Sequence, residues 1–183
     1  MDSTLQQLGF SKCSREHAVY KRVKGKEVLI VGVYVDDLII VGSSVEEITC
    51  FKKQIKGQFD MSDLGLLNYY LGIEVTRDYK GISLKQTGYA IKILKEANMW
   101  EANSTKFPMD PGLRLAKDDN SEPVNPTEYR RIIGRLRYIT HTRPNTSYAI
   151  SVASRFMEAP RVSHLQAVKQ VLRYLRGTIN YDI

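Results

Sequence analysis

Residues 28–41 constrain the fold more than any other segment, because two apolar runs enclose the acidic sequence Tyr34-Val35-Asp36-Asp37. Short runs of β-branched and aliphatic residues predict strands, and residues 28–34 are apolar enough to predict a strand that is buried on both faces. Together with residues 38–41 they predict a hairpin that carries two carboxylates at its tip. Such a tip is either a solvated acidic turn or a ligand site.

The chemistry of Asp36 and Asp37 favours a ligand site. Adjacent carboxylates repel each other, and Asn-Gly or Asp-Gly would supply the positive φ of a tight turn at lower cost. A divalent cation removes the repulsion, and Mg²⁺ prefers oxygen ligands while keeping waters and substrate phosphates in its shell. In nucleotidyl transfer two such ions, about 3.5 to 4 Å apart, activate the attacking hydroxyl and stabilise the leaving oxygen. The pair therefore suits a polymerase, with Mg²⁺ as the expected cofactor.

The whole sequence predicts an α+β protein of one or two units. A mean hydropathy of −0.31, with 43% apolar and 26% charged residues, is typical of a globular chain and not of a disordered one. The predicted elements beside the hairpin are a helix end at 2–9, a strand at 17–22, a helix at 45–57, a hairpin at 68–76 and 81–85, a helix at 88–99, an irregular segment at 100–125, and helices at 127–141, 145–158 and 163–176.

The apolar runs are too short for a membrane protein. None approaches the roughly 18 residues that would cross a bilayer, and the first residues have neither the basic nor the apolar part of a secretory signal. We therefore expect no membrane partner and a cytoplasmic or nuclear location.

The net charge of +7 is concentrated in the last third of the chain. Residues 1–125 hold 17 basic and 17 acidic side chains, whereas residues 126–183 hold 10 basic and 3 acidic ones. An excess of this kind predicts a polyanionic partner, and a solvated basic helix face is the alternative.

Several motifs, in order and over essentially the whole chain, resemble the reverse transcriptases of copia-type retrotransposons, which are RNA-directed DNA polymerases. The acidic sequence resembles the Tyr-x-Asp-Asp turn of their palm. The further matches are Tyr70-Leu71-Gly72-Ile73-Glu74-Val75 for the primer-grip hairpin, residues 105–111 for the segment that closes the palm, Tyr129-Arg130-Arg131-Ile132-Ile133-Gly134 for the first thumb helix, and Thr142-Arg143-Pro144, Ser154-Arg155-Phe156-Met157 and Leu172-Arg173-Tyr174-Leu175-Arg176-Gly177-Thr178 for the rest of the thumb.

The resemblance implies both an architecture and individual roles. It implies a palm remnant at 1–112 with a small antiparallel sheet and helices, a linker at 113–125, and a basic three-helix thumb at 126–183. Within the palm it assigns Asp36 and Asp37 to the catalytic metals, Tyr34 and Val35 to the primer terminus, and Leu71 and Gly72 to the primer grip.

The thumb helices carry two basic stripes that are expected to meet a primer–template duplex or an RNA/DNA hybrid. Arg130, Gly134 and Tyr138 are spaced at i, i+4 and i+8, and Arg137 adds a further charge beside them. Glycine at this position would let a backbone approach a minor groove, with helix packing as the alternative. The second stripe consists of Lys169, Arg173 and Arg176, for which duplex contact and simple solvation are equally good interpretations.

The resemblance also implies missing parts. We expect these 183 residues to lack the family's fingers, its first palm strand with a further metal-binding aspartate, and its ribonuclease H domain. We therefore expect weak Mg²⁺ binding, retained nucleic-acid binding and no independent polymerase activity. Because the missing strand would lie beside residues 38–41, an unpaired edge should promote self-association or accept a complementing polymerase segment. The alternative function is a domesticated, non-enzymatic module that binds nucleic acid or protein.

Overall fold

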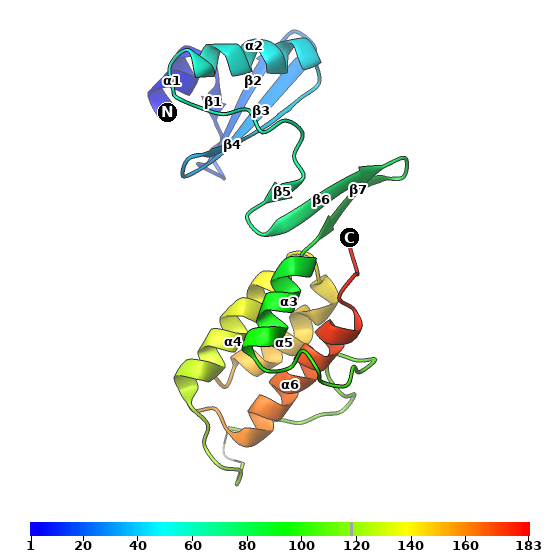
Figure 1. The fold of residues 1–183 in the computed structure, drawn as a ribbon. Coiled ribbons are helices and arrows are strands. Elements are labelled where there is room, and N and C mark those ends of the chain that lie inside the picture. The colour runs from blue at the N-terminus through cyan, green and yellow to red at the C-terminus, as the bar shows by residue number, and fades with distance from the viewer. Residues whose placement is uncertain (118) are drawn as a thin grey trace. The chain divides into compact units, whose positions relative to one another are not determined.

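The structure is a computed structural model that describes residues 1–117 and 119–183. Its contacts divide the chain into two compact units, Met1–Leu67 and Asn68–Ile183. Each unit contains helices and one small antiparallel sheet (Figure 1), which confirms the predicted α+β class. The predicted functional ranges 1–112, 113–125 and 126–183 do not coincide with these units and stay predictions.

The first unit consists of a four-stranded antiparallel sheet with two helices. The strands are adjacent in chain order, so that each is joined to the next by a hairpin or short connection. The elements are α1 (Asp2–Gln7), β1 (Ser11–Lys12), β2 (Val19–Lys24), β3 (Glu27–Tyr34), β4 (Asp37–Gly42) and α2 (Val45–Lys56).

One face of this sheet packs against both helices and the other face is open. On β3 the side chains of Leu29 and Val31 are 2% and 0% exposed and share a core with Phe51 of α2 and Leu5 of α1. Ile30, which points the opposite way, is 38% exposed. The prediction that this strand is buried on both faces is therefore wrong, because an antiparallel sheet covered on one side buries alternate residues only.

Polar side chains fix the start of α2 against the sheet. Ser44 is the N-cap residue, as its sequence position predicts, and its hydroxyl accepts a hydrogen bond from the Glu47 N–H at 3.2 Å. The buried Arg22 guanidinium donates to a Glu47 carboxylate oxygen at 2.8 Å and to the Leu8 carbonyl at 3.0 Å, and it lies over the Phe10 ring. The ion pair is partly buried, and its hydrogen bonds are largely satisfied, which is the condition under which such burial is tolerated.

The second unit begins with a three-stranded antiparallel sheet made of β5 (Tyr69–Tyr70), β6 (Ile73–Asp78) and β7 (Gly81–Lys85). The predicted hairpin between 68–76 and 81–85 is confirmed for β6 and β7. The predicted first strand is wrong in one respect, because a turn at Leu71 and Gly72 folds it into two.

In the described part of the chain, four helices pack together after this sheet and share one core. They are α3 (Thr87–Glu96), α4 (Pro126–Ile139), α5 (Ser147–Ser154) and α6 (Val162–Gly177), with a short 3-10 helix, η1 (Pro144–Thr146), before α5. The predicted helices at 127–141, 145–158 and 163–176 are thus present, but α3 contributes Ala90, Ile93 and Leu94 to the same core. A thumb of three helices is therefore not confirmed. No helix among the described residues is long and apolar enough to cross a bilayer.

The segment between α3 and α4 is irregular, as predicted, but it is not a detached tether. The Val124 N–H donates to the Pro160 carbonyl at 3.0 Å, and the Val162 N–H donates to the Glu122 carbonyl at 2.9 Å. These bonds attach the end of the segment to the start of α6. Asp118, within the predicted linker, lies outside the described residues.

Candidate functional site

The acidic sequence forms the two-residue turn between β3 and β4. Tyr34 pairs with Asp37, so that Val35 and Asp36 occupy the tip. Val35 has a φ of 53° and is 84% exposed. A β-branched residue in this left-handed region is a strained exception that costs about 1–3 kcal/mol. The pairing of β3 with β4 holds Val35 in a conformation that an unconstrained valine would avoid.

Asp36 and Asp37 are exposed, and neither carboxylate has a hydrogen-bond or ion-pair partner among the described residues. Their oxygens are ligands of the kind that a hard cation such as Mg²⁺ prefers. In the described part of the chain, however, no group of three His, Cys, Asp or Glu side chains could hold a metal ion. The residues present thus fit a divalent cation as part of its ligand shell.

The turn between β5 and β6 carries the expected primer-grip residues. Tyr70 pairs with Ile73, and Leu71 and Gly72 between them have φ values of 49° and 81°. Two consecutive positive φ values are the geometry of the tight turns that suit the twist of a hairpin. Glycine adopts this geometry freely, whereas leucine does so under strain.

The structure brings this turn into contact with the stripe predicted on α4. The Tyr138 hydroxyl donates to the Leu71 carbonyl, and a Cβ placed on Gly72 would lie 3.5 Å from a ring carbon of Tyr138. Tyr89 of α3 meets the Tyr138 ring edge-on, with 5.1 Å between the ring centroids. Residues that are 67 positions apart in the sequence therefore share one surface, which the sequence alone did not indicate.

The remaining members of the α4 stripe are exposed, and its two arginines have no ion-pair partner among the described residues. Arg130 bonds through Nε to the Pro126 carbonyl at 3.1 Å, and the Arg137 guanidinium has no partner in the described part of the chain. Among the described residues, a Cβ placed on Gly134 would find no atom within 4 Å outside its own helix backbone. Packing of helices within this structure therefore gives no reason for a glycine at Gly134.

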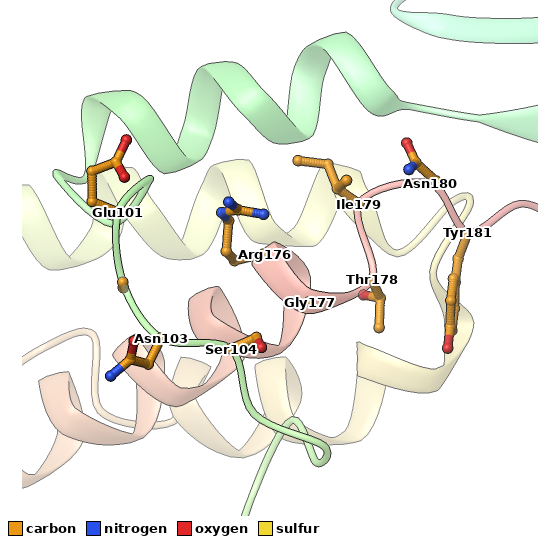
Figure 2. A pocket seen from close by; sticks show the side chains of 10 residues that line it. Glu101, Asn103, Ser104, Arg176, Gly177, Thr178, Ile179, Asn180 and Tyr181 are labelled. Carbon is orange, nitrogen blue, oxygen red and sulfur yellow. The ribbon is translucent and has the colours of Figure 1, made fainter.

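The second basic stripe is divided by the structure. Lys169 and Arg173 are exposed, whereas Arg176 donates from Nε to the Trp100 carbonyl at 2.8 Å and stacks on the Trp100 ring at 4.5 Å. Figure 2 shows Arg176 in a pocket of about 610 Å³, between the loop of Glu101 and the segment that follows α6. Arg176 thus has a structural role in holding Trp100, which neither of the two interpretations from the sequence, duplex contact or simple solvation, included.

A serine, a histidine and an aspartate also meet at the start of α6, but they do not form a nucleophilic triad. His164 is fully buried, with Nδ1 accepting from the Arg161 N–H at 3.0 Å and Nε2 bonded to the Ala116 carbonyl at 2.8 Å. Neither ring nitrogen is left to activate Ser163. Hydrogen bonds from Ser121 and Ser163 lower the pKa of Asp119 to about 2. The bond from Ser163 attaches the irregular segment to the start of α6.

Comparisons with known proteins identify the family of the chain. Residues 1–111 match the family described as Reverse transcriptase (RNA-dependent DNA polymerase). The chain is 36% identical over 176 residues to the Retrovirus-related Pol polyprotein from transposon RE1 of Arabidopsis thaliana, a match that covers 96% of this chain and 12% of the polyprotein. It is 33% identical over 187 residues to the corresponding polyprotein from transposon TNT 1-94 of Nicotiana tabacum, covering 97% and 14%.

A shorter relative matches as well. An uncharacterized mitochondrial protein of Arabidopsis thaliana is 36% identical over 151 residues, which are 82% of this chain and 62% of that protein. No solved structure is significantly similar to the chain. The chain spans only a small part of the polyproteins, but the family match covers more than half of its own length. The chain therefore belongs to the reverse transcriptases of copia-type retrotransposons.

Proposed function

We propose that this chain is the part of a copia-type reverse transcriptase that carries the metal-binding turn of the palm and the thumb that holds a primer–template duplex. The observation that carries the proposal is the contact of Tyr138 with the turn at Leu71 and Gly72, since it joins the expected primer grip to the expected thumb helix. A grip and a thumb helix that act on one duplex must lie side by side, and this contact supplies that arrangement.

The exposed stripe on α4 supports a duplex as the partner. Arg130 and Arg137 are free to neutralise phosphates, which is the source of sequence-independent affinity. Their neighbours Arg131 and Arg135 pair with Glu128 and Glu96, so the uncompensated charge of the helix lies on the stripe.

Gly134 is a feature of the stripe that attraction between charges does not explain. Glycine in a helix interior costs about 1 kcal/mol relative to alanine. With no internal packing demand at this position, close approach of a sugar–phosphate backbone to the helix offers a physical reason for the cost. Tyr138, one turn further on, would border the same groove.

The turn at Asp36 and Asp37 is the proposed metal site, with Mg²⁺ as the cation. A bound Mg²⁺ would supply a counter-charge for the two carboxylates and a link to substrate phosphates. The chain's own contribution is to hold the two carboxylates together at an exposed tip, where neither has an ion-pair partner among the described residues. The exposed Tyr34 and Val35 would then lie where a primer terminus approaches.

We expect a chain of these 183 residues alone to be inactive as a polymerase. Two-metal catalysis needs ligands on both sides of the reacting phosphate, and one turn supplies only two neighbouring carboxylates. Primer extension should be absent with the chain alone and should appear, dependent on Asp36, when a separately purified fingers and first-palm segment of the family is added. Robust incorporation by the chain alone that is lost in Asp36→Asn would contradict this expectation.

Nucleic-acid binding is tested by the salt dependence of affinity for an RNA/DNA hybrid, measured by fluorescence anisotropy. The double variant Arg130→Glu/Arg137→Glu should bind more weakly and lose about 0.9 from the slope of log K against log salt for each phosphate contact removed. The matched control is Lys53→Glu/Lys92→Glu, which makes the same change of charge at exposed positions of α2 and α3.

The comparison of the two double variants decides between a surface and a general charge effect. If both weaken binding equally, the chain attracts nucleic acid by net charge and the α4 stripe is not the contact surface. If neither weakens it, the charge excess of the last third serves another purpose.

A further inference from the structure

Thr142 and Arg143 form a buried junction just beyond the C-terminal end of α4. Thr142 is 0% exposed, and its hydroxyl donates to the Gln86 side-chain oxygen at 2.9 Å. Gln86 is itself 1% exposed and lies directly between β7 and α3. The first link of the junction therefore ties the end of α4 to the point where the sheet of the second unit meets the helices.

Arg143 makes the second link. Its side chain is 2% exposed, and its two terminal nitrogens donate to the carbonyls of Thr178, where the contact is short, and of Ile179 at 2.9 Å. The Tyr181 ring lies 5.7 Å from the guanidinium carbon, and burial lowers the pKa of the Arg143 side chain. Burial of this kind excludes direct contact with a phosphate, so Arg143 cannot serve as one more basic residue of the thumb surface.

The two carbonyls that accept hydrogen bonds from Arg143 belong to the first residues of a segment that we name the terminal strap, residues 178–183. Part of the strap lines the pocket in Figure 2. At its far end Ile183 and Leu84 of β7 exchange two backbone hydrogen bonds, at 3.1 Å and 2.8 Å. This is an antiparallel pair that adds the strap to the free edge of the sheet, and Figure 1 shows the chain end beside β7.

We propose that Thr142 and Arg143 are positioning residues for the nucleic-acid surface: they anchor the strap and the β7–α3 junction, and so hold the Leu71-Gly72 turn beside α4. The inference rests on the proposed function. The path of contact runs from the end of α4 through Arg143 to the strap, across the Leu84 pair into β7, and along the sheet to the turn. Tyr138 closes the same loop from the other side, because its hydroxyl reaches the turn directly.

Arginine is suited to this role by its shape. Thr178 is the C-cap of α6 and Ile179 follows it, so the two carbonyls lie at and just beyond the end of a helix, where a positive charge is favourable. A planar guanidinium can donate to both carbonyls at once, whereas a lysine ammonium on a flexible stem cannot reproduce the fork.

The test uses the full chain and measures three quantities: hydrogen exchange at the Leu84 amide, affinity for an RNA/DNA hybrid, and the salt slope of that affinity. In Arg143→Met we expect Leu84 exchange to accelerate at least about fivefold, the factor that one net hydrogen bond represents. Protection of Val31 in the first unit and of Ile133 in α4 should not change. Affinity should fall severalfold with an unchanged salt slope, because no phosphate contact is lost.

Two further variants keep the test decisive if Arg143→Met does not fold. Ile183→Pro removes the donor to Leu84 while leaving Arg143 in place, and it should reproduce both effects. Arg143→Lys retains the charge but not the fork, so it should resemble the methionine variant and not the parent.

Each outcome bears on a different claim. Unchanged exchange at the Leu84 amide in both Arg143→Met and Ile183→Pro would overturn the proposal that Arg143 anchors the strap to β7. A salt slope that becomes shallower by about 0.9 overturns the positioning role, since it would mean direct phosphate contact. If the parent chain binds no nucleic acid, the proposed function fails, whereas the exchange measurement still shows whether Arg143 anchors the strap.

Discussion

Substituting Gly134 by alanine should change stability and binding in opposite directions. The residue lies within α4, and a Cβ at this position meets no atom within 4 Å outside the helix backbone. Alanine therefore brings its full advantage in helix propensity, about 1 kcal/mol, without a clash. For a unit of this size the midpoint of thermal unfolding should rise by roughly 3 to 6 °C.

The same methyl group should weaken the complex with a duplex. If the backbone of the nucleic acid packs against the glycine, an added carbon overpacks the contact at a cost of about 1 to 3 kcal/mol. This range corresponds to affinity that is weaker by a factor of roughly 5 to 150. Differential scanning calorimetry measures the stability, and anisotropy with an RNA/DNA hybrid at constant salt measures the affinity.

Ser151→Ala is the matched control, because Ser151 is an exposed residue of α5 away from the stripe. It should stabilise the helix by about 0.5 kcal/mol and leave affinity unchanged. A Gly134→Ala variant that binds as tightly as the parent would refute the close approach of a backbone. A variant that is less stable than the parent would refute the open environment on which the reasoning depends.

Three other properties can be tested in the same way. The pKa of Asp119 is about 2 in the folded chain, below its unfolded value of about 3.9. The ionised Asp119 therefore stabilises the folded chain above pH 4, and this stabilisation is lost as the pH falls toward 2. The free energy of unfolding in urea should show this decrease for the parent and should lack it for Asp119→Asn. Val35→Gly should stabilise the first unit by about 1 kcal/mol, because relief of a 1–3 kcal/mol strain exceeds the entropic disadvantage of glycine; an equal or lower urea midpoint would mean that the turn is not strained. The edge of β4 should promote self-association, so light scattering should show a mass that falls on dilution and a shift to monomer in Val41→Lys, whose parent side chain is 58% exposed; a chain that is monomeric at every concentration would contradict this.

The structure also explains why Val41 and not Ile40 is the residue to change in that experiment. The Ser43 N–H donates to the Val28 carbonyl. Because backbone N–H and C=O groups alternate in direction along a strand, those of Val41 point toward β3, whereas those of Ile40 point toward the free edge of the sheet. The Ile40 side chain, however, packs against the core of the first unit. Lysine at Ile40 would therefore place a charged side chain against the core and destabilise the unit, whereas lysine at Val41 lies on the open face.

Features set by neighbours in the sequence could be predicted well. The two apolar runs indicated the β3–β4 hairpin with its acidic tip, Ser44 indicated the start of α2, and prolines bounded the helices of the second unit. The exposure of Ile30 could not be predicted in the same way. Both faces of β3 carry apolar residues, and only the position of α1 and α2 decides which face is covered.

Features set by tertiary contacts were missed for a related reason. Nothing in the local sequence of Leu71 indicates a left-handed conformation, so the turn that divides the predicted strand had only Gly72 as a signal. The contact of Tyr138 with this turn joins distant segments, and the packing of α3 with α4 and α6 depends on the whole helical unit. Neither has a periodicity or spacing that could be recognised in one sequence.

The positions where local rules are broken coincide with the proposed sites. Val35 and Leu71 adopt positive φ values that their side chains disfavour, and Gly134 lies in a helix interior without a packing reason among the described residues. Gly177 provides the contrast, because a Cβ there would lie 2.8 Å from Ser104 and packing alone explains the glycine. Natural proteins tend to keep such local conflicts where function requires them and remove them elsewhere. The three exceptions lie at the turn of Asp36 and Asp37, at the turn of Leu71 and Gly72 and on the exposed stripe of α4, which are the proposed sites. The stability changes expected at Val35 and Gly134 follow from backbone geometry and helix propensity, and they can be measured without reference to the family resemblance.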